Sequence, residues 1–463
     1  MLRDYQKRLY SRVRLAFGDG HRKVLMQCPT GGGKTWVAAY LVEQAYTEWS
    51  RVLYLVPRTE IFAQTARKLV EVGLDYHAVR AGRPTSRVKS HVVLAMTQTF
   101  SRRPDAIPNW EPDLVVIDEA HLYLEAHANL INRWPKARII PMTATPCRLD
   151  GRPLTTIADV VVSEVQTSDL IRDGWLAPVC IIHGESPDLG RVKMRAGEYD
   201  PLSLGAAYQR KGVIGDVVAT WEREASDRQT LVFCASKPQS QALAAAFCAA
   251  GYRFAHLDAK STKKERKRVL GLLEAGELDG ITNVGLFVEG IDLPALSCVV
   301  LATSTMSLSR YLQMIGRGMR TAPNKADLLY IDHSSSGNWR EHGMPWDDRT
   351  WDLDGSGRIV APRGTPRLEH QARGARRELE PLGGRMVAGG RSRAPGQAAI
   401  MRRASQSILP RPCPGWARGV AAQWHAAERK RYSQGLALPL SAGKPATGYT
   451  ERACLQALGP FAV

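Results

Sequence analysis

The eight residues Cys28-Pro29-Thr30-Gly31-Gly32-Gly33-Lys34-Thr35 constrain the fold of this chain more than any other stretch. An apolar run at residues 24–26 precedes them, and a run with helical character follows at 36–42. Three consecutive glycines let backbone N–H groups converge on an anion, because no β-carbon stands in the way. The start of the following helix adds unpaired N–H groups and the positive end of its dipole. We therefore predict a phosphate-binding loop between a strand and a helix.

The two residues that end the loop give it a nucleotide chemistry. Lys34 would bring a positive charge to the β- and γ-phosphates, and the hydroxyl of Thr35 would bind Mg²⁺. Cys28 is a departure, because the strict pattern has glycine at its position. A plain glycine-rich turn is the alternative interpretation, and the Lys-Thr ending in a strand–helix context argues against it. We expect the phosphates of ATP to lie against Thr30, Gly31, Gly32, Gly33, Lys34 and Thr35.

A pair of carboxylates, Asp118 and Glu119, follows the entirely apolar run 114–117. Such a run is typical of a parallel strand that is covered on both faces. Asp118 is placed to hold Mg²⁺ beneath the phosphates, and Glu119 could deprotonate an attacking water. Adjacent carboxylates are common on protein surfaces, but here they follow buried residues downstream of a phosphate loop. The pair therefore indicates an ATPase.

Apolar strands alternate with helices over two long stretches of the chain. The first stretch ends near residue 160, and the second begins near 206 and ends near 340. This alternation predicts an α/β fold with two parallel sheets, each covered by helices on both faces. Ligands of such sheets bind at the carboxyl ends of the strands, where the motifs named above lie. We predict domains at 1–160 and 206–340, a connector at 161–205, and a basic, poorly ordered tail at 341–463.

The charge of the chain points to a polyanionic partner. Its net charge is +18 over 463 residues, and residues 361–463 hold 17 Lys and Arg against 5 Asp and Glu, or +12. Nucleic acid is the partner that this balance favours, although a solvated basic tail is the simpler alternative. No apolar run approaches the length of a membrane span. Eight cysteines without paired spacing predict reduced thiols in a cytoplasmic protein and no zinc cluster.

The order of the motifs resembles that of the superfamily-two helicases of the DEAD/DEAH type, over roughly residues 1–340. The resemblance rests on six elements: Gln6, the glycine loop, Asp118-Glu119-Ala120-His121, Thr143-Ala144-Thr145, Gly290 with Asp292, and Gln313 followed by Gly316-Arg317 and Arg320. Residues 2–6 and 169–176 are most similar to bacterial and phage helicases of the RadD-like and type III restriction subunit kinds. The resemblance implies two tandem RecA-like domains.

The resemblance also implies roles for residues of both domains, with ATP and Mg²⁺ bound between them. In the first domain it implies adenine recognition by Gln6 with Arg3 and Tyr5, and coupling through His121, Thr143 and Thr145. In the second, it implies that Gly290 and Asp292 close the site, that Gln313 couples it, and that Arg317 and Arg320 reach the γ-phosphate. Arg320 is then the expected arginine finger. The residues expected to hold the nucleic-acid backbone are Pro57, Arg58, Thr97, Gln98 and Thr282.

We expect an ATP-dependent helicase or translocase that acts on DNA, mostly through the backbone of the strand, as a monomer and without a membrane partner. The motifs do not separate DNA from RNA, so an RNA helicase is an alternative. A second alternative is a nucleic-acid-stimulated ATPase that serves a restriction or repair complex as motor or clamp without unwinding. A binding protein with a dead site is disfavoured, because Lys34, Asp118, Glu119 and Arg320 are all present.

Overall fold

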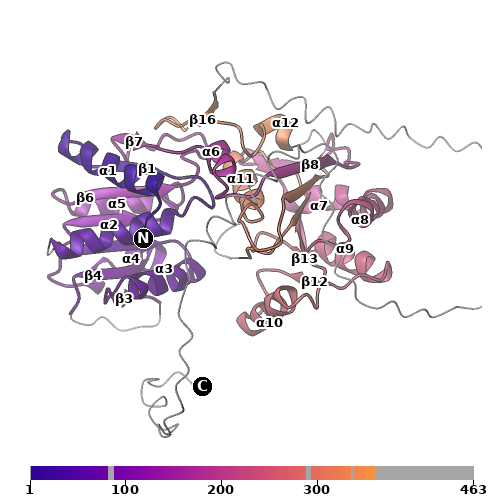
Figure 1. Ribbon diagram of the computed structural model, residues 1–463, viewed down its shortest axis with the longest axis horizontal. Helices are drawn as coiled ribbons and strands as arrows, with labels where there is room; N and C mark the ends of the chain where they lie inside the picture. Colours follow the sequence, from indigo (N-terminus) through magenta and orange to yellow (C-terminus); the bar gives the residue numbers. More distant parts are fainter. Residues whose placement is uncertain are drawn as a thin grey trace, which may run out of the picture. The chain divides into compact units, whose positions relative to one another are not determined.

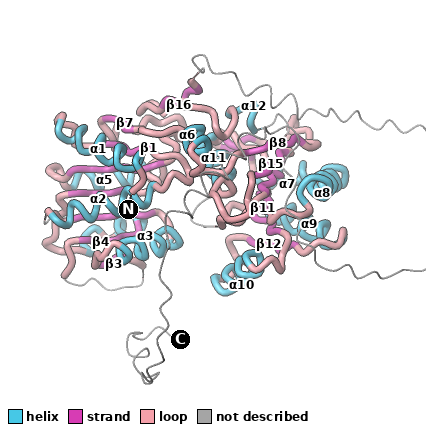
Figure 2. The backbone as a smooth tube through the Cα atoms, viewed as in Figure 1, coloured by secondary structure: helices cyan, strands magenta, loops and turns pink. Residues whose placement is uncertain are grey.

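The computed structural model describes residues 2–48, 50–81, 88–287, 293–334, 338–355 and 357–360, all within one compact unit. Two large parallel sheets account for most of the strands, and helices cover both faces of each (Figures 1 and 2). This arrangement confirms the predicted α/β fold. No helix within the described residues is both long enough and apolar enough to span a bilayer.

The first sheet has seven strands in the order β3-β4-β2-β5-β6-β1-β7, and each neighbouring pair is parallel. Strand β1 therefore lies between two strands that are distant from it in sequence, so the loop that follows β1 meets the loop that follows β6. The strands are β1 (Val24–Gln27), β2 (Val52–Val56), β3 (His77–Val79), β4 (Val92–Met96), β5 (Leu114–Ile117), β6 (Arg138–Thr143) and β7 (Val160–Val162).

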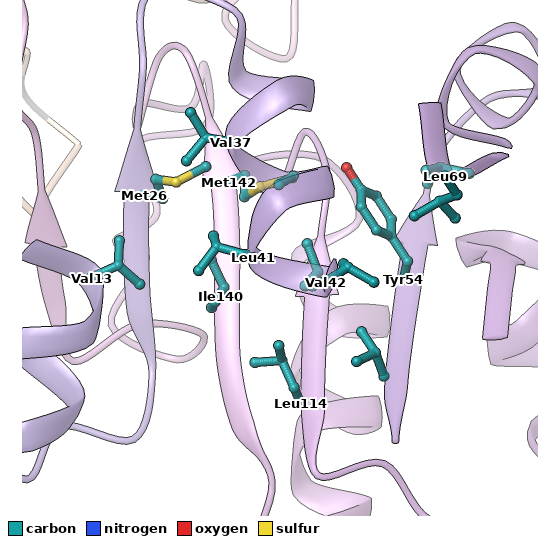
Figure 3. Packing of buried hydrophobic residues seen from close by; sticks show 14 of the residues in the cluster. Val13, Met26, Val37, Leu41, Val42, Tyr54, Leu69, Leu114, Ile140 and Met142 are labelled. Carbon is teal, nitrogen blue, oxygen red and sulfur yellow. The ribbon is translucent and has the colours of Figure 1, made fainter. Parts of the chain in front are cut away.

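Alternate residues of these strands face different helices. One face packs against α1 (Asp4–Gly18), α2 (Lys34–Thr47) and α3 (Thr59–Glu71), and Figure 3 shows side chains of α2 against β1, β6 and β2. The other face packs against α4 (Thr97–Arg102), the 3₁₀ turn Pro104–Ala106 and α5 (Leu124–Arg133). Because both faces are covered, the strands are apolar at nearly every position rather than alternating in polarity.

The second sheet has six parallel strands in the order β12-β13-β11-β14-β15-β8. Helices α10 (Lys263–Glu274) and α11 (Leu308–Gly316) pack on one face, and α7 (Pro201–Tyr208), α8 (Lys211–Ala225) and α9 (Lys237–Ala249) pack on the other. The strands are β8 (Val179–His183), β11 (Thr230–Cys234), β12 (Phe254–Leu257), β13 (Gly280–Asn283), β14 (Cys298–Ala302) and β15 (Leu328–Asp332).

The segment expected to be a connector, 161–205, contributes more to the sheets than the sequence indicated. Strand β7 begins one residue before it and forms an edge of the first sheet, and β8 forms an edge of the second. Between them lies α6 (Thr167–Arg172), and a hairpin of β9 (Met194–Arg195) and β10 (Glu198–Tyr199) follows β8. Strands β7 and β8 each have a short apolar run, at 160–162 and 179–182, but the irregular pattern around the two runs did not show which sheet they would join.

Residues 338–355 and 357–360 continue the folded structure beyond the predicted boundary at 340. They form α12 (Asn338–His342) and a ribbon of β16 (Arg349–Thr350) and β17 (Arg358–Ile359). The backbone N–H of Leu154 donates to the carbonyl of Leu353 over 2.7 Å. The backbone of Arg349 exchanges two hydrogen bonds with the Gln166 side chain. Trp339, Trp346 and Leu353 also pack against the cores, but these apolar residues are scattered and not periodic, so no pattern revealed the segment. The predicted tail beyond residue 360 lies outside the described residues.

Candidate functional site

The glycine loop runs from the end of β1 to the start of α2 with two residues in the left-handed conformation. Gly31 has a φ of 82° and Gly33 a φ of 79°. A β-carbon on Gly33 would lie 2.4 Å from Nε2 of Gln6, and one on Gly31 would lie 2.6 Å from Cδ2 of Leu176. Both positions therefore require glycine for conformation and for space.

Cys28, the departure from the strict loop pattern, is fully buried beneath the loop. A β-carbon on Gly32 would lie 2.8 Å from its Sγ atom, so the thiol fills the space under that glycine. Burial raises the pKa of Cys28 to about 12. The residue therefore serves as a small packing group and not as a reactive thiolate.

The start of α1 docks onto the same loop. The hydroxyl of Tyr5 donates to the Gly32 carbonyl over 2.7 Å, and Nε2 of Gln6 donates to it over 3.1 Å. The guanidinium of Arg3 lies 3.8 Å from the centre of the Trp175 ring. Gln6 is only 3% exposed. The structure thus brings the three residues expected to recognise adenine to the edge of the phosphate loop, although Trp175 was not singled out from the sequence.

Lys34 lies between the two carboxylates that follow β5. Its Nζ atom is 3.1 Å from Oδ1 of Asp118 and 2.6 Å from Oε1 of Glu119. Burial opposes the charge of the lysine, but the two carboxylates outweigh it and raise the pKa of Lys34. Burial raises the pKa of Asp118. Although burial also disfavours the charged form of Glu119, Lys34 and His121 hold the pKa of Glu119 below its usual value. The cluster is therefore a charged lysine beside an ionised glutamate.

One carboxylate oxygen of Glu119 does not contact Lys34. Its Oε2 atom is buried and has no hydrogen-bond partner; Nδ1 of His121 lies 3.6 Å away. The residue has a φ of 47°, in the left-handed region that side chains rarely adopt. An unpaired buried carboxylate oxygen is costly, and such costs are typical of functional sites. A water between Glu119 and a bound phosphate would give this oxygen a partner.

A chain of hydrogen bonds leads from this cluster to the second domain. Nδ1 of His121 lies 2.9 Å from Oγ1 of Thr143, and its Nε2 lies 3.3 Å from Oγ of Ser309. Oγ1 of Thr145 lies 2.7 Å from the same Ser309 hydroxyl. Burial lowers the pKa of His121 to about 4, so the ring is neutral near pH 7 and one nitrogen donates while the other accepts.

Ser309 is a site residue that the sequence did not reveal. It lies on α11, the helix that leads to Arg317. The helix itself was predicted, but no pattern indicated which of its polar side chains would meet His121. The three coupling residues of the first domain, His121, Thr143 and Thr145, are brought together by the structure as expected.

The end of α11 comes close to the phosphate loop. A β-carbon on Gly316 would lie 2.5 Å from Cγ2 of Thr30. The charge of Arg317 contributes to the lowered pKa of Glu119, and Arg320 forms a backbone bridge with Leu176, the residue that covers Gly31. A pocket lies at this junction of the phosphate loop and α11. The residues that line it include Pro29, Thr30, Thr145, Gly316, Arg349 and Trp351.

The remaining predicted site residues are either buried, at the surface, or outside the described residues. Gln313 is 4% exposed, and its Nε2 donor has no hydrogen-bond partner. Thr97 and Thr282 are fully buried; Oγ1 of Thr282 donates to the Ser240 carbonyl over 2.9 Å. Both side chains are therefore enclosed by protein, Thr97 at the start of α4 beside Nε2 of His127 and Thr282 on β13, and neither is exposed to a nucleic-acid strand in this structure. Pro57 is buried, Arg58 half-buried and Gln98 exposed, whereas Gly290 and Asp292 lie outside the described residues.

The donor set suits a magnesium ion that is bound together with a nucleotide. Thr35 lies in the first turn of α2 and Asp118 at the end of β5, so one hydroxyl and one carboxylate are available beside Lys34. Mg²⁺ commonly binds through one or two protein oxygens and completes its shell with phosphate oxygens and water. Within the described residues, no group of three or more His, Cys, Asp or Glu could hold a metal ion.

Acidification should destabilise the protein through its buried histidines. His127 is fully buried, and burial lowers its pKa to about 4. Unfolded histidine binds a proton below about pH 6.5, whereas the folded residue stays neutral until about pH 4, so stability falls as the pH falls through this window. Between pH 6.5 and 4, the free energy of unfolding of His127→Gln should therefore change by about 1.4 kcal/mol less per pH unit than that of the wild type.

Urea unfolding at pH 7, 6 and 5 measures this difference. His21→Gln, at an exposed position, is the matched control and should follow the wild-type protein. A His127→Gln slope equal to that of the wild type would contradict the prediction.

Two family models match the chain. The first, described as type III restriction enzyme, res subunit, matches residues 1–148, and the second, the helicase conserved C-terminal domain, matches residues 212–322. A 51.5 kDa protein of a Lactococcus phage is 28% identical over 71% of this chain and 68% of its own length. The putative ATP-dependent helicase IRC3 of Saccharomyces cerevisiae is 27% identical over 72% of this chain but only 51% of its own length.

The fold agrees with these matches. A fragment of a putative HsdR subunit of a type I restriction enzyme from Vibrio vulnificus superposes with a TM-score of 0.59 at 23% identity, over 77% of this chain and 67% of the fragment. The chain is therefore a superfamily-two helicase, an ATP-hydrolysing class built on two RecA-like domains. Within that class, residues 1–148 are similar to the res subunit of type III restriction enzymes.

Proposed function

We propose that this chain is a DNA-directed helicase or translocase in which both domains contribute to one ATP site. The observation that carries the proposal is the buried, unpartnered Oε2 atom of Glu119 beside the loop lysine. A carboxylate that is ionised, enclosed and short of one hydrogen bond is suited to accept a proton from water. A phosphate loop alone would support nucleotide binding; this carboxylate supports hydrolysis.

In this proposal Lys34 changes partners when ATP binds. Without nucleotide it neutralises Asp118 and Glu119, and a bound triphosphate would compete for the same ammonium group. Thr35 and Asp118 would hold Mg²⁺, which supplies positive charge to the phosphate oxygens. Glu119, relieved of one contact, would then orient and deprotonate the attacking water. Residues 118–121 thus serve as the DEAH-type motif.

The second domain would complete the site with two arginines. Arg317 already contributes to the low pKa of Glu119, and Arg320 follows on the same turn. Guanidinium groups stabilise charge that develops on the transferred phosphate. The contacts from Glu119 through His121 to Ser309 would also couple the site to α11. A change at Glu119 would alter the hydrogen bonds to that helix. Repeated docking and release of α11 would then drive movement along a strand.

DNA is favoured over RNA by the match to a restriction-enzyme family and by the basic segment 361–463. The test is the ATPase rate of the full-length chain with single-stranded DNA, duplex DNA and RNA of equal length, followed by strand displacement with either overhang polarity. We expect stimulation by DNA. Stimulation by RNA alone would overturn the DNA assignment in favour of an RNA helicase. We further propose a monomeric, cytoplasmic protein, which light scattering and cell fractionation would test.

The restriction-subunit match favours one further candidate function, an ATPase motor that translocates without unwinding. Such a motor would hydrolyse ATP on duplex DNA and displace a third strand from a triplex. It would leave an overhang substrate paired. A helicase would separate the overhang substrate, so the two assays together distinguish the candidates.

Deletion of residues 361–463 should weaken non-specific DNA binding. The segment carries +12 of the net charge of +18. Each lysine or arginine that contacts a phosphate releases counterions, so affinity falls steeply with salt in proportion to the number of contacts. We expect the deletion to reduce the slope of the logarithm of the binding constant against that of salt concentration. Fluorescence anisotropy over a salt series measures it, and an unchanged slope would show that the segment makes no phosphate contacts.

A further inference from the structure

Lys325 is a buried lysine for which the function proposed above gives no role. It lies in the short loop between α11 and β15, five residues after Arg320, and is 5% exposed. Lysine is among the residues least often buried, because its ammonium group loses its hydration on burial. A lysine kept in such a place calls for a physical reason.

The ammonium group of Lys325 is bound by backbone carbonyls. Its Nζ atom donates to the carbonyl of Gly318, to that of Arg320 over 2.7 Å and to that of Pro294 over 3.2 Å. These three bonds use all three donors of the group. Two of the carbonyls belong to the turn that carries Arg317 and Arg320, and the third belongs to a separate segment that precedes β14.

The charges near Lys325 do not explain its burial. Asp327, the nearest acidic residue in the loop, forms an ion pair of 2.5 Å with Arg228. Burial lowers the pKa of Lys325 to about 7; Asp327 opposes this shift, whereas Arg320 and Arg228 add to it. The protein therefore holds a costly ammonium group against carbonyls, where an apolar side chain would be cheaper to bury.

Other contacts already enclose the 316–320 turn, so the carbonyls of Gly318 and Arg320 are the groups that Lys325 can still fix. A β-carbon on Gly318 would lie 2.4 Å from Cδ1 of Leu328, and the carbonyl of Met319 accepts a hydrogen bond of 2.7 Å from Ala177. With the carbonyls of Gly318 and Arg320 also bound, the peptide units on both sides of Met319 are fixed in direction. The direction of these peptide units determines where the side chains of Arg317 and Arg320 begin.

We propose that Lys325 is a positioning residue for the arginines of the second domain: its ammonium group fixes the backbone of the 316–320 turn so that the guanidinium groups meet the nucleotide. The proposal rests on the function proposed above, in which those arginines act on the γ-phosphate. Lys325 does not touch the nucleotide in this account. It acts through the turn, so its loss should affect the rate of hydrolysis and not the binding of ATP.

The test compares Lys325→Met with the wild-type, full-length chain in steady-state ATPase assays. A displacement of catalytic groups by about 1 Å can cost about 10²-fold in rate. We expect kcat to fall about 10–100-fold while the KM for ATP and the affinity for a fluorescent ATP analogue stay within about two-fold. Lys136→Met, at an exposed position, is the matched control. An unchanged kcat would overturn the proposal, and so would a loss of analogue binding equal to the loss of rate.

Two further variants separate the possible failures. Lys325→Arg keeps a charged donor, so it should restore part of the rate; a folded Lys325→Arg as slow as Lys325→Met would contradict positioning by charge. In the double variant with Arg320→Ala, the loss at Lys325 should largely disappear, because both act through one turn. If neither Arg317→Ala nor Arg320→Ala lowers the rate, the proposed site fails. If one of the arginine variants is slow while Lys325→Met hydrolyses ATP at the wild-type rate, this inference fails and the site stands.

The pH profile is a readout that a merely structural role would not change. As pH rises through about 7, Lys325 loses one proton and with it one of its three donors. The groups whose charges act on Lys325 are Asp327, Arg320 and Arg228. The ratio of the wild-type kcat to that of Lys325→Arg should therefore fall between pH 6 and 9. A ratio independent of pH, with both proteins folded, would contradict the proposal.

Discussion

Glu119→Gln should lower the kcat of ATP hydrolysis by about 10²–10⁴-fold, the usual contribution of a general base. Glutamine keeps the shape of the side chain and can still accept a hydrogen bond from Lys34, but its amide cannot take a proton from water. Because Lys34 and the glycine loop remain, ATP should still bind. The measurements are steady-state ATPase with saturating DNA and equilibrium binding of a fluorescent ATP analogue.

The control for this variant is Glu125→Gln, a glutamate in α5 whose side chain is 79% exposed and paired with Arg152. It should hydrolyse ATP like the wild type. If purified, folded Glu119→Gln retained full activity, another group would have to be the base and the assignment of the site would be wrong.

Arg320→Ala should lower kcat by about 10³–10⁵-fold, as the loss of an arginine finger does. The physical reason is that the charge on the transferred phosphate grows in the transition state, so the guanidinium contributes more there than in the ground state. We therefore expect the affinity for the ATP analogue to change little. Rapid-quench measurement of a single turnover would place the loss in the chemical step rather than in product release.

Arg223→Ala provides the matched control in the second domain. Arg223 lies on α8, is half exposed and pairs with its neighbour Glu224 over 2.7 Å. A comparable loss in this control would point to damage to the whole domain. If Arg317→Ala lost the larger share of activity and Arg320→Ala remained active, the finger would be Arg317, and the first assignment would be incorrect.

Much of the fold was accessible from the sequence because its information is local. The apolar runs at 52–56 and 114–117 identify strands that are covered on both faces, and their spacing predicts parallel connections. Since the carboxyl ends of such strands share one edge, the sequence also brought Lys34, Asp118 and Glu119 into one site. The structure agrees, with Nζ of Lys34 within hydrogen-bond distance of Glu119.

Contacts between distant segments were not accessible in the same way. Ser309 meets His121 across 188 positions of the chain, and Lys325 reaches Pro294 across 31. Nothing in the spacing of either residue marks it, because a serine on a helix and a lysine in a loop are ordinary on a surface. The burial of Thr97 and Thr282 was missed for the same reason: a motif fixes the residue type, but the packing of neighbours decides whether it faces solvent.

The sequence by itself determined the two sheets, the order of the motifs and the chemistry of the glycine loop, since these depend on periodicity and on residues close together in the chain. Only the tertiary structure decided that Gln6 is enclosed against the loop, that the fold continues past residue 340 to residue 355, and that a buried lysine binds the arginine-bearing turn. These features depend on which distant segments meet. That is set by the summed packing of both sheets and not by any local pattern.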